Sequence, residues 1–434
     1  MSSYIAHRGQ KLYEHLEGVA ELAKTYAGKI GMGNYGELLG LLHDFGKYSA
    51  EFQKYITDAI KKNEKHFNPD EDEDFEDPTG KKGKIDHSTA GAQFLSYKNR
   101  SSNARKILGQ FLSLCLVSHH SGLIDCLTTN SGGTWDSYSK RLSKNDIKTH
   151  QEECARNIDK HIFERIRAIL ADKSFTMPFE EKCRDIVRIS PEKNPLSTVS
   201  QFQLGMLVRF LFSALIDADR QDTAHSEKPK AARHCLQGNY RSWNELIERL
   251  ENKYKTFQTK SNVDEIRKEI SNHCLHAAKR PKALFTLTVP TGGGKTLASL
   301  RFSLHHAREH HIERIIYVIP FTSIIDQNAH AVREILELKE FPEDSGKIVI
   351  EHHSNIGADV QSWKEKLLAE NWDAPIIYTT MVQLLETLFG AGTRGARRMY
   401  QLAKAVIVFD EIQTLPIKCV HLFNNAINFL INHC

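Results

Sequence analysis

The fold of the first half is decided by the stretch LLHDFGK at residues 41–47, in which His43 and Asp44 end an apolar helical run. An adjacent imidazole and carboxylate can bind one metal ion, and the carboxylate can bridge to a second ion. The pair is weak evidence when taken alone, because a lone His on an apolar helix face is usually a core residue with a satisfied hydrogen bond. A metal site therefore needs further ligands from elsewhere in the chain.

Other helical stretches of the first half also carry metal-competent side chains. His15 projects from an apolar stripe with spacings of three and four over residues 12–26, and the tandem His119-His120 closes the apolar segment 106–118. The candidate ligands are His15, His43, Asp44, His87, His119, His120 and Asp219, with Asp217 as the competitor of Asp219. Burying so many titratable groups is costly unless they satisfy one another or hold cations, so we expect a metal site.

The chain of 434 residues is long enough for two or three domains. The helical period of the first half is interrupted by a charge-segregated run at 68–84, where we expect a surface loop. A polar stretch at 226–230 then leads into amphipathic segments at 240–257 and 263–277. We predict a multidomain chain with an all-α domain at 1–228, a helical linker at 229–280 and an α/β domain at 281–434.

Short apolar runs rich in β-branched residues mark the second half, separated by helix-compatible stretches. The runs are Ala283–Val289, Ile315–Ile319, Lys347–Ile350, Pro375–Tyr378 and Ala405–Phe409. Continuous apolar strands that alternate with helices are typical of a parallel sheet covered on both faces. The pattern predicts an α/β domain with a parallel sheet.

A glycine-rich turn, VPTGGGKT at 289–296, separates the first of these runs from a helix. Glycines let backbone N–H groups close around phosphates, and Lys295 would reach the β and γ phosphates while Thr296 binds Mg²⁺. Val289 replaces the first Gly of the strict G-x-x-x-x-G-K-T pattern, so a plain loop is the alternative.

An acidic pair, Asp410-Glu411, ends the last apolar run. There the Asp can hold magnesium through water while the Glu polarises the attacking water, although acidic residues at strand ends are often only solubilising groups. Because the acidic pair occurs together with the glycine-rich loop, we favour a nucleotide-binding role for Asp410 and Glu411 over a solubilising one. The predicted ATP and Mg²⁺ residues are Thr291, Gly292, Gly293, Gly294, Lys295, Thr296, Asp410 and Glu411.

Composition narrows the class of protein without deciding the function. No segment has the roughly 18 uninterrupted apolar residues of a membrane-spanning helix, and the amino terminus lacks the apolar core of a secretory signal. The 8 cysteines form no C-x-x-C pair, and the net charge of +4 permits a polyanionic partner without demonstrating one. We expect a soluble, cytoplasmic protein with reduced cysteines.

The order of the metal-competent residues resembles that of the HD metal-dependent phosphohydrolase superfamily. Two details resemble its CRISPR-associated nuclease branch: Ser121-Gly122 after the tandem histidines, and Asp-Ala-Asp at 217–219. The resemblance implies a first metal held by His15, His43, Asp44 and Asp219, and a second held by His87, His119 and His120, with Asp44 bridging. It also implies catalytic roles for Asp44 and Lys47. Lys47 would contact a phosphate, and the alternative is that it is a solvated lysine.

Two divalent ions in such a site would lower the pKa of a bridging water, orient it for attack on a phosphodiester and stabilise the leaving oxygen. Ligands rich in nitrogen favour a transition metal, here Mn, Fe, Co or Ni, over Mg or Ca.

The glycine-rich loop and the Asp410-Glu411 box together resemble superfamily-two helicases, in which Glu411 would be catalytic. Residues 319–327 and 378–383 are similar to strand-tracking motifs of that family. The implied nucleic-acid contacts are Thr322, Ser323, Thr379 and Thr380, for which helix capping is the alternative. We interpret Arg394, Arg397 and Arg398 as a solvated face rather than a DNA groove.

An HD domain ahead of such a helicase lobe resembles the CRISPR-associated nuclease-helicases of type I interference systems. The family implies metal-dependent cleavage of single-stranded DNA, ATP-dependent strand pulling and recruitment by an RNA-guided surveillance complex in antiviral defence. Only 21 residues follow Gln413, so we expect the second helicase lobe to be absent from this chain, another polypeptide to supply it, and little motor activity without it.

Two rival classes fit part of the pattern. The HD domain can instead be a phosphohydrolase acting on a nucleotide or a signalling phosphodiester, which the helicase-like fusion disfavours. Alternatively, the chain is a non-catalytic recruitment module, which the complete ligand set disfavours.

Overall fold

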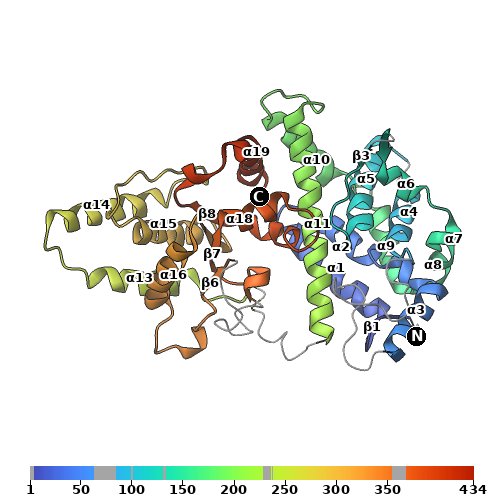
Figure 1. The fold of residues 1–434 in the computed structure, drawn as a ribbon, viewed down its shortest axis with the longest axis horizontal. Coiled ribbons are helices and arrows are strands. Elements are labelled where there is room, and N and C mark those ends of the chain that lie inside the picture. The colour runs from blue at the N-terminus through green and yellow to red at the C-terminus, as the bar shows by residue number, and fades with distance from the viewer. Residues whose placement is uncertain are drawn as a thin grey trace. The chain divides into compact units, whose positions relative to one another are not determined.

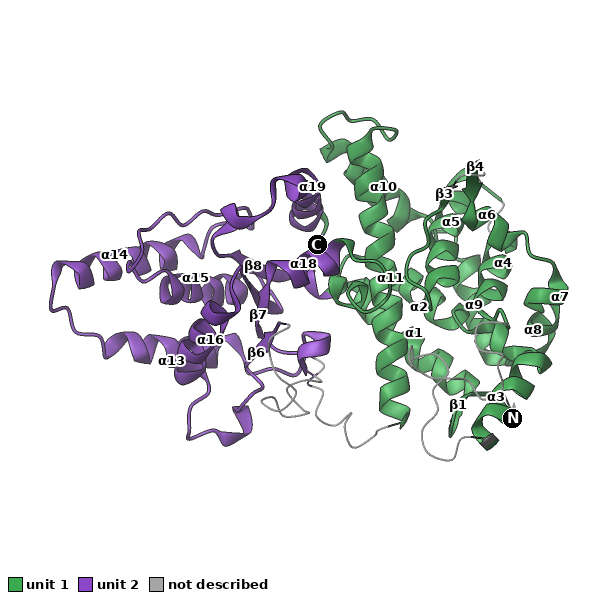
Figure 2. Cartoon of the chain, in the orientation of Figure 1, with its two compact units in different colours: residues 1–232, 389–400, 433 green, residues 233–388, 401–432, 434 purple. Residues whose placement is uncertain are grey.

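The chain forms two compact units in a computed structural model (Figure 2). The first unit contains residues 1–232, 389–400 and 433, and the second contains residues 233–388, 401–432 and 434. The structure describes residues 4–62, 85–98, 101–130, 133–227, 236, 238–353 and 368–434. The charge-segregated run at 68–84, expected as a surface loop, lies outside these ranges.

The first unit is helical apart from two small antiparallel sheets, which confirms the predicted fold class of this half (Figure 1). Its strands are β1 (Ile5–His7), β2 (Gln10–Lys11), β3 (Leu127–Asn130) and β4 (Gly133–Asp136). Its helices are α1 (Leu12–Gly28), α2 (Gly33–Leu42), the 3₁₀ helix η1 (Phe45–Tyr48), α3 (Ala50–Lys62), α4 (Ser88–Lys98), α5 (Asn103–Ser118), α6 (Ser137–Leu142), α7 (Asp146–Thr149), α8 (Gln151–Asn157), α9 (Lys160–Ala171), α10 (Met177–Ile189) and α11 (Thr198–Glu227).

Helices α1 and α2 pack closely because small residues line their contact. The α1 stripe predicted from spacing is buried, as at Leu12, Leu16 and Val19. On α2, a Cβ added at Gly40 would lie 2.5 Å from the Cα of Ala20. Only glycine allows this approach, which brings the end of α2 against α1.

Helix α11 has the length and composition of a membrane-spanning helix, but 67% of its most apolar window is buried inside the structure. It packs against α1, α2 and α5. It also carries several acidic residues in its second half, including Asp217 and Asp219. These properties are those of a buried core helix, so α11 positions side chains in the middle of the first unit.

The second unit is built on a parallel sheet. Its strands are β5 (Arg314–Ile319), β6 (Val349–His352), β7 (Ile376–Thr380) and β8 (Ala405–Phe409). Its helices are α13 (Trp243–Lys255), α14 (Asn262–Ala277), α15 (Lys295–Glu309), α16 (Thr322–Leu336), α18 (Met381–Phe389) and α19 (Ile417–His433), with 3₁₀ helices η2 (Pro342–Asp344), η3 (Ala396–Leu402), which runs into this unit from the first, and η4 (Ile412–Thr414).

The sheet order is β6-β7-β5-β8, and every pairing is parallel. All residues of β5 are buried, as expected for a strand covered on both faces. Parallel strands bring their carboxyl ends to one edge of the sheet, where ligands bind in open α/β sheets. The second half is therefore the α/β domain that the apolar runs predicted.

The prediction of a strand at residues 283–289 is wrong. This segment forms no ladder within the described residues, and Leu284 is 73% exposed. Strand β8 is one of the two outer strands of the sheet and is only partly buried throughout. An apolar run predicts a strand, but pairing also requires a neighbour in register, which the local sequence does not specify.

Helices α13 and α14, which we expected as a linker, belong to the second unit. Helix α13 packs on α15 and α16, and it contributes Leu246, Ile247 and Leu250 to the core beneath the sheet. Helix α14 packs on α15.

Candidate metal centre and phosphate site

Four predicted ligands from three helical regions converge in the first unit. The Nε2 atom of His15 lies 3.2 Å from Nε2 of His43, 3.4 Å from Oδ2 of Asp44 and 3.3 Å from Oδ1 of Asp219. The Nε2 atom of His43 lies 3.4 Å from the same Asp44 oxygen and 3.6 Å from the same Asp219 oxygen. These atoms surround a common point from α1, the end of α2 and α11.

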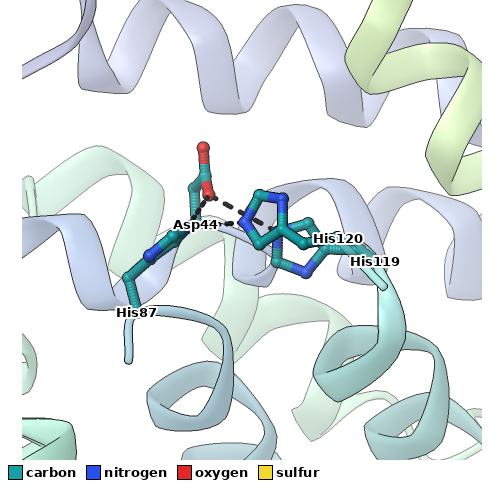
Figure 3. Close-up of side chains that lie close together, drawn as sticks. All are labelled: Asp44, His87, His119 and His120. Carbon is teal, nitrogen blue, oxygen red and sulfur yellow. Dashed lines mark hydrogen bonds and ion pairs between the residues drawn. The ribbon is translucent and has the colours of Figure 1, made fainter. Parts of the chain in front are cut away.

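The other oxygen of Asp44 faces a second set of histidines (Figure 3). Its Oδ1 atom lies 3.8 Å from Nε2 of His87 and 3.7 Å from Nε2 of His119. The Nε2 atoms of His87 and His120 are 2.5 Å apart. One carboxylate thus presents an oxygen to each of two ligand sets, which is the arrangement expected of a bridging ligand.

Two of the histidines, His43 and His119, are oriented by their second ring nitrogens. The Nδ1 atoms of His43 and His119 lie 2.8 and 2.7 Å from the carbonyl oxygens of Gly40 and Leu116. Such contacts place the proton on Nδ1 and leave Nε2 as the ligating atom.

Burial and mutual charge set the ionisation of the first ligand set. Burial lowers the pKa of His43, but Asp44 and Asp219 raise it by more, to about 9. Burial raises the pKa of Asp44, but Lys47 and His43 hold that pKa well below its ordinary value. In the first ligand set the carboxylates therefore favour the protonated form of His43, and the histidines favour the ionised form of Asp44. A divalent cation would replace this proton.

Two buried atoms of the cluster support this exchange. Asp44 Oδ1 and His119 Nε2 have no hydrogen-bond partner among the described residues. Buried polar atoms are normally paired, and leaving them unpaired costs free energy. The donor set of imidazoles and carboxylates fits a divalent transition metal, so these residues can hold metal ions.

Lys47 is completely buried, and its ammonium lies 2.8 Å from Oδ2 of Asp44. The alternative of a solvated lysine is therefore wrong. The contact fixes the carboxylate of Asp44 and compensates its charge. A direct contact between Lys47 and a substrate phosphate stays a prediction.

The glycine-rich loop of the second unit contains two left-handed glycines directly before a helix. Gly292 and Gly294 have φ angles of +81° and +79°, a left-handed conformation that glycine adopts without strain. Lys295 begins α15, a helix of 15 residues, so the loop leads into a helix amino terminus that favours anions. The ammonium of Lys295 lies 3.2 Å from Oε1 of Glu411. The two predicted nucleotide motifs therefore meet.

The remaining nucleotide-site residues lie nearby. The hydroxyl of Thr296 donates to Asn328 at 3.2 Å, and the backbone N–H of Asp410 donates to the Val318 carbonyl at 3.0 Å. Arg267 of α14 donates to the Gly292 carbonyl at 2.8 Å. Sequence reasoning missed Arg267, because nothing local connects α14 with the loop.

The four predicted nucleic-acid contacts differ in exposure. Ser323 is exposed and Thr322 is half-buried at the start of α16. Thr379 is completely buried and donates its hydroxyl to the His352 carbonyl at 2.9 Å. The Thr380 hydroxyl accepts a hydrogen bond from the Gln383 N–H at 3.2 Å, as in helix capping. This geometry favours the capping and packing alternative for Thr379 and Thr380.

Comparison with known proteins identifies both units. Residues 32–208 match the family model for the Cas3 HD domain, and residues 240–429 match the model for DEAD/DEAH box helicases. The chain combines a Cas3 HD domain with a DEAD/DEAH box helicase domain. Both matches agree with the two domains that the resemblance of the sequence implied.

Individual relatives agree with this assignment. The CRISPR-associated nuclease/helicase Cas3 of Haloferax volcanii is 29% identical over 149 residues, which are 30% of this chain and 16% of that protein. Crystal structures of T. fusca Cas3, alone and with AMPPNP, match with 16% and 15% identity and TM-scores of 0.54 and 0.55. Each match covers 98% of this chain and 48% of the solved chain. The chain therefore spans about half the length of these solved relatives, which share its fold.

The HD domain distinguishes Asp219 from its competitor Asp217. Asp217 binds Arg397 at 2.7 Å and accepts from the Tyr400 hydroxyl at 2.8 Å, so its side chain points away from the histidines. Arg397 and Arg398 are buried, and the prediction that they form a solvated face is wrong. The buried carboxylate of Asp217 explains the burial of Arg397, because an ion pair compensates both charges.

The predicted metal ligands of the HD domain, His15, His43, Asp44, His87, His119, His120 and Asp219, are called the HD cluster below. Sequence reasoning missed Asp222, which supports this cluster without joining it. Its Oδ2 atom lies 2.7 Å from Nδ1 of His15 and accepts from Nε2 of Gln10 at 2.8 Å. A carboxylate behind a metal-binding histidine orients the ring and increases its basicity. The available signal was position, because Asp222 lies three residues after Asp219 and so on the same helix face.

Proposed function

We propose that this chain is a metal-dependent nuclease that cuts single-stranded DNA and works with an ATP-dependent helicase in CRISPR type I antiviral defence. The observation that carries the proposal is the position of Asp44, whose two oxygens face two separate ligand sets. The first set would hold one Mn, Fe, Co or Ni ion and the second set another. Such ions supply an activated water and charge stabilisation for phosphodiester hydrolysis.

The protein residues around the ions have separate tasks. His15, His43 and Asp219 would hold the buried ion, and Lys47 would keep Asp44 in its bridging orientation. A phosphodiester must reach this recessed cluster, and a stacked duplex would lose a few kcal/mol for each base step that it disrupts to do so. Single strands are therefore the favoured substrate.

The helicase domain would bind ATP and Mg²⁺ through the loop and the acidic pair. Lys295 would contact the β and γ phosphates, Thr296 and Asp410 the magnesium, and Glu411 the attacking water. Thr322 and Ser323 would contact the backbone of the strand. We further propose recruitment by an RNA-guided surveillance complex in the cytoplasm. The need for a second helicase lobe on another polypeptide stays a prediction.

The test is a nuclease assay with Mn²⁺, Co²⁺ or Ni²⁺ and without ATP. Single-stranded DNA should be cut, blunt duplex should resist, and Asp44→Ala should abolish cutting. Lys295→Ala is the matched control and should cut normally, because its position lies in the other unit. Cutting of duplex at the same rate, or loss of cutting in Lys295→Ala, would refute the proposal. Faster hydrolysis of free nucleotides than of DNA would favour the phosphohydrolase alternative.

A further inference from the structure

A second group of potential ligands lies in the helicase domain, where α16 faces β6. It contains Asp326 of α16, Glu351 of β6 and His353, which follows β6. The Nε2 atom of His353 lies 3.3 Å from Oδ1 of Asp326 and 3.6 Å from Oε2 of Glu351. One nitrogen and two carboxylate oxygens thus face a common point, and each of the three atoms lies within 4.8 Å of the others.

The state of His353 indicates a ligand rather than a simple hydrogen bond. Its side chain is only 3% exposed, yet neither ring nitrogen has a hydrogen-bond partner among the described residues. A buried imidazole without a partner is costly. The HD cluster also contains buried candidate ligand atoms without a hydrogen-bond partner among the described residues, namely Asp44 Oδ1 and His119 Nε2.

The surrounding residues hold the three ligands in place. Arg333 follows Asp326 by seven residues, two helical turns along the same face of α16, and it pairs with Oε1 of Glu351. Arg333 also donates to the Val349 carbonyl at 3.1 Å, which fixes α16 against β6. The side chain of Asp326 is 64% exposed, so the carboxylate opens the group to solvent.

Charge also favours a cation at this point. Arg333 balances the charge of the Glu351 carboxylate. Among the described residues, no arginine or lysine forms an ion pair with Asp326. A neutral His353 would therefore face net negative charge, which a divalent cation compensates.

We propose that Asp326, Glu351 and His353 bind one divalent transition-metal ion, distinct from the ions of the HD domain. One imidazole and two carboxylates suit Zn²⁺, Mn²⁺ or Co²⁺ better than Ca²⁺, which prefers a shell of six to eight oxygens. Solvent molecules would complete the coordination on the open side of Asp326. The alternative is an ion-paired triad in which a protonated His353 replaces the metal.

Metal content distinguishes these possibilities. The full chain should be loaded with Co²⁺, freed of excess ion and analysed by elemental analysis and visible absorption, both in the natural sequence and with Asp44→Ala. His353→Ala should lose one Co²⁺ per chain in both backgrounds. His330→Ala is the matched control, because His330 lies on α16 and pairs only at the surface, with Glu334 at 3.4 Å. It should lose none.

Asp326→Asn provides an independent test, because substitution of an exposed carboxylate preserves the fold. It should weaken Co²⁺ binding at this position by at least tenfold, with unchanged circular dichroism. Equal Co²⁺ content in His353→Ala and His330→Ala would overturn the proposal in favour of the ion-paired triad. Loss of the ion in the Asp44→Ala background would support it even if the HD domain proved inactive.

Discussion

Replacing Asp222 with Asn tests whether the HD cluster depends on a residue that does not face the metal. The substitution preserves the shape of the side chain, which touches His15 Nδ1 at 2.7 Å, but removes its charge. One oxygen of the carboxylate is packed against α1, because a Cβ added at Gly18 would lie 1.9 Å from Asp222 Oδ1. An amide at this position should therefore stay beside His15.

The size of the effect follows from this contact. A hydrogen bond to a charged group contributes about 1.5–3 kcal/mol, and loss of an outer ligand partner weakens metal binding about 10–100-fold. A tenfold change in affinity corresponds to about 1.4 kcal/mol. We therefore expect Asp222→Asn to bind the ion of the first set about 10–100-fold more weakly and to leave the ion at His87, His119 and His120 in place.

The assay is competition with a chelator for Mn²⁺ or Co²⁺, with unfolding measured in parallel. Asp185→Asn is the matched control, because this aspartate is in the same unit, is 44% exposed and pairs with Arg188. Its metal affinity should be unchanged. Equal affinity in Asp222→Asn and Asp185→Asn would refute the argument that His15 is oriented through its second nitrogen.

Three further results are expected. Gly46→Ala should destabilise the HD domain by about 1–3 kcal/mol in urea and lower its metal occupancy, because the new Cβ would lie 2.3 Å from the His87 carbonyl oxygen. Gly28→Ala is the control, and it should change neither quantity, because its Cβ would meet open space. Lys295→Ala should weaken binding of a fluorescent ATP analogue; unchanged binding would contradict the phosphate role. Burial raises the pKa of Asp86, but Lys144 and Thr89 lower it by more, to about 2 from 3.8. Because this pKa is depressed by folding, Asp86 stabilises the fold above pH about 4 by about 2 kcal/mol, and this is lost as the pH falls through about 2. The difference in unfolding free energy between the natural chain and Asp86→Asn should shrink over that range.

The parts of the fold that depend on local patterns could be predicted from the sequence. The apolar stripe of α1 and the apolar runs of β5 to β8 are continuous enough to be recognised without knowledge of their neighbours. The segment 283–289 has the same kind of sequence and forms no strand, since pairing depends on a partner far along the chain. Similarly, the amphipathic helix α13 is visible in the sequence, whereas its place in the core beneath the sheet is not.

The choice between Asp217 and Asp219 shows the same limit within the candidate site. Two residues apart on a helix, their side chains point in nearly opposite directions, so only one can face the histidines. Which one does so is decided by Arg397, which lies 180 residues away in the sequence and binds Asp217. A single sequence contains Asp217, Asp219 and Arg397, but it does not show which of the two aspartates Arg397 binds.

The gradient of burial across the HD cluster gives its two halves different properties. His15 and His43 are completely buried, whereas in the second set only His119 is buried, His87 is 12% exposed and His120 lies on the surface. The cluster is therefore open to solvent on the side of His120, where a substrate phosphate would approach, and the buried set would serve as its fixed base. Asp44 connects the two halves, because its oxygens face both sets while Lys47 holds it in place. A substitution at Asp44 should therefore disturb both halves, whereas one at His120 should disturb only the open half.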